Sequence, residues 1–317
     1  MAIRAATREA IDAAGLALRE GALVAFPTET VYGLGADATN GRAVAAIFAA
    51  KGRPRFNPLI VHASDAEAAA RHGRLGKAGR RLAEAFWPGA LTLVVAREPN
   101  CPVADLTTAG LQTIALRVPA HPVAQALLRA AGRPVAAPSA NRSGHVSSTS
   151  AAHVDADLGS SVAVVLDGGS TPIGLESTVV DVSGSEPIVL RLGGIPREAI
   201  GRALGQPVAV AKGEPGKPTS PGMLARHYAP AARLRLEVRD VHDGEALLAF
   251  GRIVPEHSGV TFNLSASGDL AEAAANLFAA LRTLDRPGAA TIAVMPIPHE
   301  GLGEAINDRL RRAAKLP

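Results

Sequence analysis

The sequence predicts an α/β protein with two domains, a larger one built on a mixed sheet with helices on its faces and a smaller one at the C-terminus. The chain has 317 residues, more than a single hydrophobic core usually organises. Hydrophobic residues make up 47% and charged residues 20%, which is typical of a folded domain rather than a disordered chain. Short apolar runs alternate with helical patterns, but the helices between them are too few for strict strand–helix–strand repeats.

Residues 1–205 are expected to form the larger domain, a mixed twisted sheet with flanking helices. Helical patterns cover 5–20, 41–50, 65–86 and 121–131. Strand patterns cover 21–26, 58–62, 90–96, 113–119, 134–138, 162–169, 177–183 and 187–193.

Residues 206–230 differ from both flanking regions, since they contain five prolines and little apolar periodicity. They predict a linker. Beyond it, 231–317 returns to alternation, with strands near 233–238, 246–250, 260–264 and 291–295 and helices near 269–284 and 303–314. This pattern indicates a small α/β domain of Rossmann-like type.

Composition excludes several classes of protein. No apolar run approaches the roughly 18 to 20 residues of a membrane span. Charged residues interrupt the N-terminal helix pattern, so we expect no signal peptide, a cytoplasmic location and no membrane partner. Cys101 is the single cysteine, which excludes disulfides and cysteine-based zinc sites. The net charge is +4, yet arginine supplies 28 of the 33 cations, a skew that does not by itself indicate nucleic-acid binding.

The stretch "KGRPRFNPLIVH", 51–62, places three cations among Gly and Pro directly before a buried strand. A stiffened loop holds Lys51, Arg53 and Arg55 in place at low entropic cost, which suits a polyphosphate. The alternative is a solvated cationic loop at a helix C-terminus.

Polar residues also interrupt other strands. "FPTETVYGLG", 26–35, is a strand-end turn rich in hydroxyls, and "AAPSANRSGHVSST", 136–149, runs from a strand into a polar loop. "GLESTVVD", 174–181, and "VLRLGG", 189–194, add Ser177 and Arg191. Arg117, within "TIALRVP", is costly to bury unless it pairs internally with Asp or Glu or receives a substrate carboxylate. Together these strands predict one shared polar, cationic cavity.

These motifs, in this order, resemble the YrdC-like domain. The segment "SPGMLARHYAP" and the tail "GLGEAINDRLRRAA" resemble the long, two-domain form of the threonylcarbamoyl-AMP synthase family. The resemblance covers nearly the whole chain and is weakest over 231–290. It implies synthesis of threonylcarbamoyl-adenylate from L-threonine, bicarbonate or carbon dioxide, and ATP, with release of pyrophosphate. The product would pass to a complex that transfers the threonylcarbamoyl group to tRNA.

The resemblance also implies a division of the site. L-Threonine would contact Thr30, His62, Arg117, the Ala137 backbone and Ser177. ATP would contact Lys51, Arg53, Asn57, Thr113, Ser139, Ser147, Arg191 and Tyr228. Lys51 and Arg53 would act electrostatically, with no nucleophile or general base assigned. Mg²⁺ is expected with ATP, its ligands are left open, and no tightly bound organic cofactor is expected.

Two alternatives remain open. A basic concave surface could bind double-stranded RNA or tRNA without chemistry, although a duplex would not reach arginines inside apolar strands. A related carbamoyl-transfer activity is the other, since this domain type also occurs in hydrogenase maturation proteins. We further predict that the Pro-rich residues 213–230 cover the cavity as a lid, with Tyr228 reaching the nucleotide, because a carbamate–phosphate anhydride must be protected from water.

Overall fold

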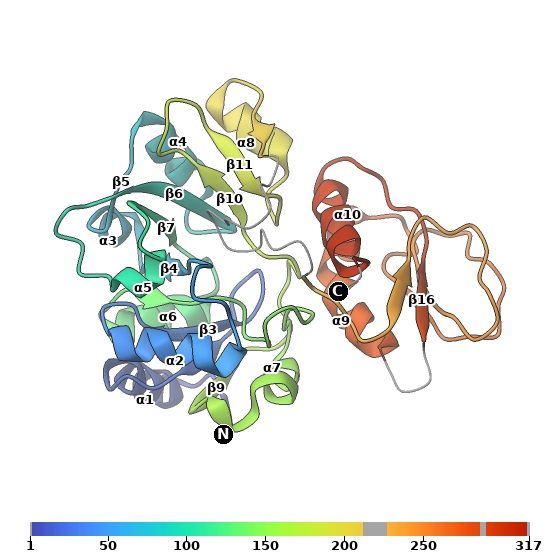
Figure 1. Ribbon diagram of the computed structural model, residues 1–317, viewed down its shortest axis with the longest axis horizontal. Helices are drawn as coiled ribbons and strands as arrows, with labels where there is room; N and C mark the ends of the chain where they lie inside the picture. The colour runs from blue at the N-terminus through green and yellow to red at the C-terminus, as the bar shows by residue number, and fades with distance from the viewer. Residues whose placement is uncertain (1, 212–226, 286–289, 316–317) are drawn as a thin grey trace.

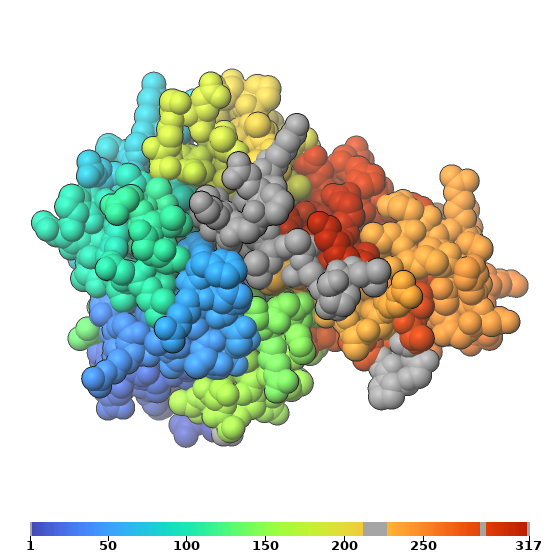
Figure 2. Space-filling view, viewed as in Figure 1, coloured from blue at the N-terminus to red at the C-terminus, as the bar shows by residue number. Residues whose placement is uncertain are grey.

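The computed structural model describes residues 2–211, 227–285 and 290–315. These residues form two lobes, and the smaller one, coloured orange to red, contains the C-terminal residues (Figures 1 and 2). Within the described residues, no helix is long and apolar enough to cross a membrane. The predicted pairing of a large and a small α/β unit is confirmed.

A twelve-stranded sheet organises the larger lobe, in the order β1-β9-β2-β3-β8-β4-β7-β6-β10-β11-β12, with β5 beside β6. Some neighbours run parallel, such as β4 and β7, and others antiparallel, such as β6 and β7, so the predicted mixed sheet is confirmed. The strands are β1 (Ala2–Ala5), β2 (Val24–Phe26), β3 (Gly33–Asp37), β4 (Ile60–His62), β5 (Gly73–Arg74), β6 (Leu91–Arg97), β7 (Thr113–Arg117), β8 (Val135–Ala136), β9 (Val164–Asp167), β10 (Thr178–Asp181), β11 (Ile188–Arg191) and β12 (Ala209–Val210).

Helices flank this sheet (Figure 1). Side-chain caps begin several of them, because the first N–H groups of a helix have no partner inside it. Thr7 caps α1, Asn40 caps α2 and Ser150 caps α7. The helices are α1 (Arg8–Arg19), α2 (Gly41–Lys51), α3 (Ala66–Ala70), α4 (Lys77–Phe86), α5 (Asp105–Thr108), α6 (Pro122–Ala131), α7 (Ala151–Leu158), the 3₁₀ turn η1 (Gly159–Ser161) and α8 (Arg197–Leu204).

Two predicted helices were wrong in extent. The first was expected over 5–20, but residues 2–5 pair with β9 as β1, and the helix begins only after Thr7. The second was expected as one helix over 65–86. Instead it divides into α3 and α4, because β5 between them pairs antiparallel with β6. In both places sheet hydrogen bonds to a distant segment outweigh the local helical pattern.

The smaller lobe has a four-stranded sheet, β13 (Arg233–Arg235), β14 (Ala246–Ala249), β15 (Thr261–Asn263) and β16 (Thr291–Val294), in the order β13-β16-β14-β15. Every pair in it is parallel. The helices α9 (Leu270–Leu284) and α10 (Leu302–Ala313) lie between this sheet and the larger lobe (Figure 1). The predicted small α/β domain of Rossmann-like type is therefore confirmed.

The two lobes share a hydrophobic core. Val31, Val146 and Leu175 of the larger lobe belong to the same buried cluster as Phe278 of α9. Gly174 lies at this interface with a φ of +70°, and a Cβ there would lie 2.4 Å from the carbonyl oxygen of Ala274. A side chain at this position would force the lobes apart, so the lobes meet as a packed interface.

The division into 1–205, 206–230 and 231–317 stays a prediction. Residues 212–226, most of the predicted linker and lid, lie outside the described residues. Of the remainder, Val208 is buried in the core and Ala209–Val210 pairs with β11.

Candidate active site

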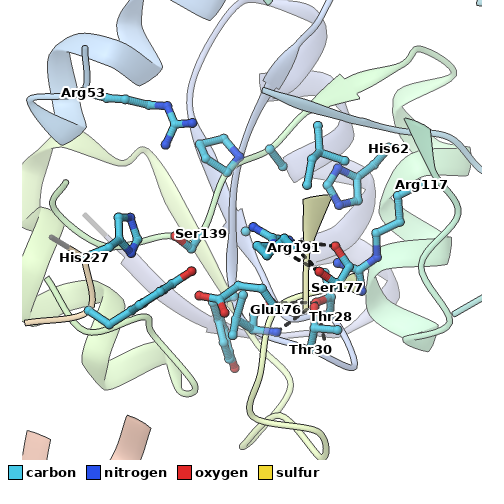
Figure 3. A pocket seen from close by; sticks show the side chains of 17 residues that line it. Thr28, Thr30, Arg53, His62, Arg117, Ser139, Glu176, Ser177, Arg191 and His227 are labelled. Atoms are coloured by element: carbon cyan, nitrogen blue, oxygen red, sulfur yellow. Dashed lines mark hydrogen bonds between the residues drawn. The ribbon is translucent and has the colours of Figure 1, made fainter. Parts of the chain in front are cut away.

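A polar cavity opens where strand ends of the large sheet meet residues 227–228 (Figure 3). Most of the residues predicted from the sequence line it. These are Thr30, Arg53, His62, Arg117, Ala137, Ser139, Ser177, Arg191 and Tyr228. Lys51, Asn57, Thr113 and Ser147, which were also predicted, are not among the residues that line it.

The turn after β2 positions the first wall of the cavity. The Thr28 hydroxyl donates to the Val31 carbonyl, at 2.6 Å, and accepts from the backbone N–H groups of Thr30 and Val31. Because this hydroxyl donates to Val31, the Thr30 hydroxyl 2.8 Å away donates to it. A Ser/Thr turn of this kind fixes its backbone through one side chain. It thereby holds Thr30 against the cavity.

Arg117 at the end of β7 has one of the two kinds of partner that the sequence left open. Its Nη2 lies 2.6 Å from Oε1 of Glu29, and its Nε donates to the Gly89 carbonyl at 3.3 Å. Oε2 of Glu29 accepts from the backbone N–H of Ala120. Burial alone would raise the pKa of Glu29, but the Arg117 charge and these hydrogen bonds hold it below its ordinary value. The internal partner of Arg117 is therefore Glu29.

His62 stands beside Arg117, as its register partner across the β4–β7 pair. Burial and the Arg117 charge lower the pKa of His62 to about 3. The imidazole is therefore neutral at pH 7. Its Nδ1 is buried without a hydrogen-bond partner among the described residues, which is uncommon for a buried polar atom.

Ser177 and Arg191 both line the cavity, and their side chains are hydrogen-bonded to each other. Arg191 donates to the Ser177 carbonyl from Nε at 3.1 Å and to its hydroxyl from Nη2 at 3.0 Å. The Ser177 hydroxyl also lies 2.7 Å from that of Thr92. A Cβ on Gly193 would be 2.3 Å from the Glu176 carbonyl oxygen, so only glycine allows the segment after β11 to approach this turn.

Arg53 and Lys51, the two cations of the stretch 51–62 that were predicted at the site, have different positions. Arg53 lines the cavity and donates to the carbonyls of Asn57 and Pro58 at 3.2 and 2.9 Å. Burial and the charge of Arg191 lower the pKa of Arg53 to about 9. Lys51 instead donates from Nζ to the Ser139 carbonyl at 2.6 Å and to the Asn141 carbonyl. Lys51 thus ties α2 to the loop after β8.

The other predicted nucleotide contacts are scattered. Asn57 is buried, and neither polar atom of its side chain has a partner among the described residues. Thr113 starts β7, four residues and roughly 13 Å from Arg117 at its other end. The Ser147 hydroxyl donates to Oε1 of Glu176 at 2.5 Å. On the L-threonine side, the backbone N–H of Ala137 donates to the Ile60 carbonyl.

Among the cavity-lining residues that sequence reasoning missed are a carboxylate, Glu176, and an imidazole, His227. Both directly precede residues that it selected, Ser177 and Tyr228. Glu176 is a carboxylate in a cavity otherwise rich in cations, and no sequence pattern reports such a neighbourhood. Thr28 and Tyr32 also line the cavity, and the hydroxyl-rich turn "FPTETVYGLG" was the signal for them.

Tyr228 closes one side of the cavity and is buried. Its ring stacks on Phe278 of α9, with ring centroids 5.5 Å apart and planes at 24°. The neighbouring His227 packs edge-on against it at 4.0 Å, and burial lowers the pKa of His227 to about 3. Tyr228 has a positive φ of 63°, which is uncommon for a residue other than glycine. Packing from the smaller lobe therefore supports this wall.

Figure 3 shows that the cavity has two sides. His62, Arg117 and Thr30 lie together on one side, with Ser177 next to them. Arg53, Ser139 and His227 lie on the other, and Arg191 lies between. A zwitterion of amino-acid size suits the first side, where a cation stands beside hydroxyls and a neutral imidazole. The second side offers cations and backbone groups to a larger anion.

Comparison with known proteins decides the family. A family model described as "Telomere recombination" matches residues 16–193, and one described as "Threonylcarbamoyl-AMP synthase, C-terminal domain" matches 195–315. The threonylcarbamoyl-AMP synthase of Bacillus subtilis is 43% identical, over 96% of this chain and 92% of its own. That of Pyrococcus abyssi is 42% identical, over 94% and 92%. The chain belongs to the threonylcarbamoyl-AMP synthase family.

The family is one of enzymes, and the resemblance inferred from the motifs is confirmed. A crystal structure of P. abyssi Sua5 complexed with L-threonine superposes with a TM-score of 0.90 at 38% identity. The match covers 98% of this chain and 96% of that one, so both lobes of this threonylcarbamoyl-AMP synthase family member share the architecture.

Proposed function

We propose that this protein makes L-threonylcarbamoyladenylate from L-threonine, bicarbonate or carbon dioxide, and ATP, with release of pyrophosphate. The observation that carries the proposal is the two-sided cavity, which places Arg117 and His62 opposite Arg53 and Ser139. Family membership supports it, as does the L-threonine complex of the P. abyssi relative.

On the first side, Arg117 receives the carboxylate of L-threonine. A guanidinium has five N–H donors, and the contacts of Arg117 with Glu29 and Gly89 use only some of them. Thr30 and Ser177 offer hydroxyls to the substrate's own polar groups. His62 is neutral at pH 7 and adds no charge that would repel the ammonium form of L-threonine. This arrangement selects an amino acid by its carboxylate and holds its amine toward the second side.

On the second side, Arg53 and Arg191 face the phosphates of ATP. The ammonium loses a proton to water, and the free amine then adds to carbon dioxide and loses a second proton to water to give a carbamate. A carbamate oxygen attacks the α-phosphorus, and the bond from this phosphorus to the leaving pyrophosphate breaks. An anion thus approaches a polyanion, and fixed cations lower the resulting barrier because they need no reorganisation at the moment of reaction. Holding the two reactants together contributes on the order of 7 kcal/mol in favourable cases.

Mg²⁺ is expected to enter with ATP, bound to its phosphates, and it neutralises charge there. Glu176 is the carboxylate that lines the cavity, and Glu29 is paired with the cavity-lining Arg117, so each carboxylate already accepts from an arginine. Over the described ranges, no three His, Cys, Asp or Glu side chains are grouped as a metal site. We therefore assign the ion to the substrate, and we assign no side chain as general base.

The product is a reactive mixed anhydride. Its role would be to supply the threonylcarbamoyl group for tRNA modification, through a separate transfer complex and in the cytoplasm. The RNA-binding alternative finds no support in the geometry, because Arg117 and Arg191 are only 3% and 7% exposed and a duplex would not reach them.

The test is incubation with ATP, bicarbonate and L-threonine while pyrophosphate release and incorporation of labelled bicarbonate into an adenylate are followed. We expect both signals to require L-threonine. Pyrophosphate release that persists without L-threonine would reject this function and favour the related carbamoyl-transfer activity. RNA binding with steep salt dependence and no pyrophosphate release would instead favour the binding module.

A further inference from the structure

Arg309 of α10 belongs to the smaller lobe but reaches the wall of the cavity. Its side chain is fully buried, and a buried guanidinium is tolerated only when it is paired. Nε lies 3.1 Å from Oε2 of Glu176, and Nη1 lies 3.0 Å from Oδ2 of Asp308. The guanidinium carbon stands 5.1 Å from the centre of the Tyr228 ring, within the range of a cation–π contact.

Glu176 is the residue through which Arg309 acts on the cavity. It lines the cavity from the turn before β10 and is only 5% exposed. Oε1 accepts from the Ser147 hydroxyl at 2.5 Å, and Oε2 accepts from Arg309. Burial alone would raise the pKa of Glu176, but the charges of Arg309 and Arg191 hold it below its ordinary value. The carboxylate is therefore ionised, and its charge is balanced from the other lobe.

Loss of Arg309 would leave a buried anion facing the cavity. Such a charge repels phosphate at close range, because a low-dielectric wall screens it poorly. The same loss would remove the cation beneath the Tyr228 ring. The second effect falls on Tyr228, and the first falls beside Arg191, whose charge also acts on Glu176; both residues are assigned to the nucleotide.

On the other side of the cavity, the contacts that orient the polar side chains come from the larger lobe. Glu29 orients Arg117, Thr28 orients Thr30, and His62 packs edge-on against Phe26. All of these residues belong to the larger lobe. A change in α10 should therefore affect one substrate and spare the other.

We infer that Arg309 is a positioning residue for the nucleotide half of the cavity, by which the C-terminal domain neutralises Glu176 and supports Tyr228. It contacts neither substrate in this scheme. The inference rests on the proposed function, to which it adds a role for the smaller domain.

The same helix provides a matched control. Glu304 of α10 also pairs across the lobe boundary, with Nη2 of Arg197 lying 2.8 Å from its Oε1. Neither residue lines the cavity. Glu304→Gln removes an interlobe ion pair from α10, as a change at Arg309 does, without touching Glu176 or Tyr228.

The test measures L-threonine affinity by calorimetry and the KM for ATP by pyrophosphate release, in the full chain. For Arg309→Met we expect the KM for ATP to rise roughly ten- to a hundredfold, with the L-threonine Kd within about twofold. Glu304→Gln should leave both values within about twofold. The double variant Glu176→Gln with Arg309→Met should recover most of the lost ATP affinity, since it removes the unpaired carboxylate.

An unchanged KM for ATP in Arg309→Met, an equal loss for both substrates, or a double variant no better than the single one would overturn the inference. If Arg309→Met does not fold, Arg309→Lys is measured in the same way. It keeps the charge but not the planar donor, and a smaller rise confined to ATP is expected. Wild-type protein is assayed first, and absence of L-threonine-dependent pyrophosphate release would reject the proposed function. An Arg309 variant that weakens ATP and L-threonine equally would reject only this inference.

Discussion

Nη2 of Arg117 lies 2.6 Å from Oε1 of Glu29, and the two residues are 88 positions apart in the sequence. The side chains are 4% and 11% exposed. The pair therefore joins the turn after β2 to the end of β7 in a place where water does not compensate a lone charge. It orients the cation that we assign to the carboxylate of L-threonine.

Glu29→Gln should weaken both the fold and L-threonine binding. Removal of one partner of a buried ion pair costs about 3 kcal/mol, because the other charge is left uncompensated. Urea unfolding measures the first effect, and calorimetry with L-threonine, where we expect roughly tenfold weaker binding, measures the second. Glu67→Gln is the control, since its ion pair with Arg71 is exposed and should contribute less than about 1 kcal/mol. Equal stability losses in the two variants would contradict this account of Glu29.

The free energy of unfolding should fall as pH is lowered from about 6.5. The unfolded chain binds a proton on each histidine near pH 6.5, whereas His62 in the folded chain does so only near pH 3. Protons therefore favour the unfolded state between pH 6.5 and pH 3. For one such histidine, the loss in the free energy of unfolding is about 2 kcal/mol at pH 5.

Urea unfolding at a series of pH values measures this slope. His62→Asn should reduce it between pH 6.5 and 5, and His62→Asn combined with His227→Asn should reduce it further, because the pKa of His227 is likewise lowered to about 3. A slope in that interval that neither change alters would show that these imidazoles are not buried in the neutral form.

Arg53→Met should raise the KM for ATP roughly tenfold or more, since it removes a cavity-lining cation that we propose to face the phosphates. Arg55→Met is the matched control, two residues further along the same loop, and Arg55 is exposed. We expect its KM values within about twofold of wild type. Steady-state pyrophosphate release gives both values, and similar losses in the two variants would assign the effect to the general charge of the loop.

Tyr228→Ala should lower both ATP affinity and the yield of adenylate. The substitution removes the ring that stacks on Phe278 and forms one wall of the cavity. Burial of an aromatic ring of this size contributes several kcal/mol, so we expect ATP affinity to fall at least roughly tenfold.

Tyr228→Phe keeps the ring and removes only the hydroxyl, and it separates packing from hydrogen bonding. Calorimetry with ATP and quantification of the adenylate check both variants. Unchanged affinity and yield in Tyr228→Ala would exclude a nucleotide role for this residue.

Much of the fold was predictable because its signals are local. Alternation of apolar residues marked the strands of both lobes, and the motif residues sat at the strand ends, where such side chains converge. The residues predicted for the L-threonine side, Thr30, His62, Arg117, Ala137 and Ser177, all line one cavity. Errors occurred where sheet pairing cut into a helical pattern, as at 2–5 and 73–74.

The nucleotide side was less predictable, because its geometry depends on contacts between distant segments. Lys51 and Arg53 stand two residues apart in one motif, yet Arg53 faces the cavity while Lys51 bonds carbonyls about 90 residues away. Ser147 turns its hydroxyl to Glu176, and no sequence spacing reports that partner.

The sequence by itself determined the two-domain α/β architecture, the family and the set of polar residues that strand ends bring to one cavity, since periodicity and motif order are properties of the chain. Only the tertiary structure decided how those charges are balanced. It paired Arg117 with Glu29 and brought Arg309 of α10 to Glu176, 133 positions away. The physical reason is that a buried charge is stabilised by whatever group lies within a few ångströms of it, and long-range packing selects that group.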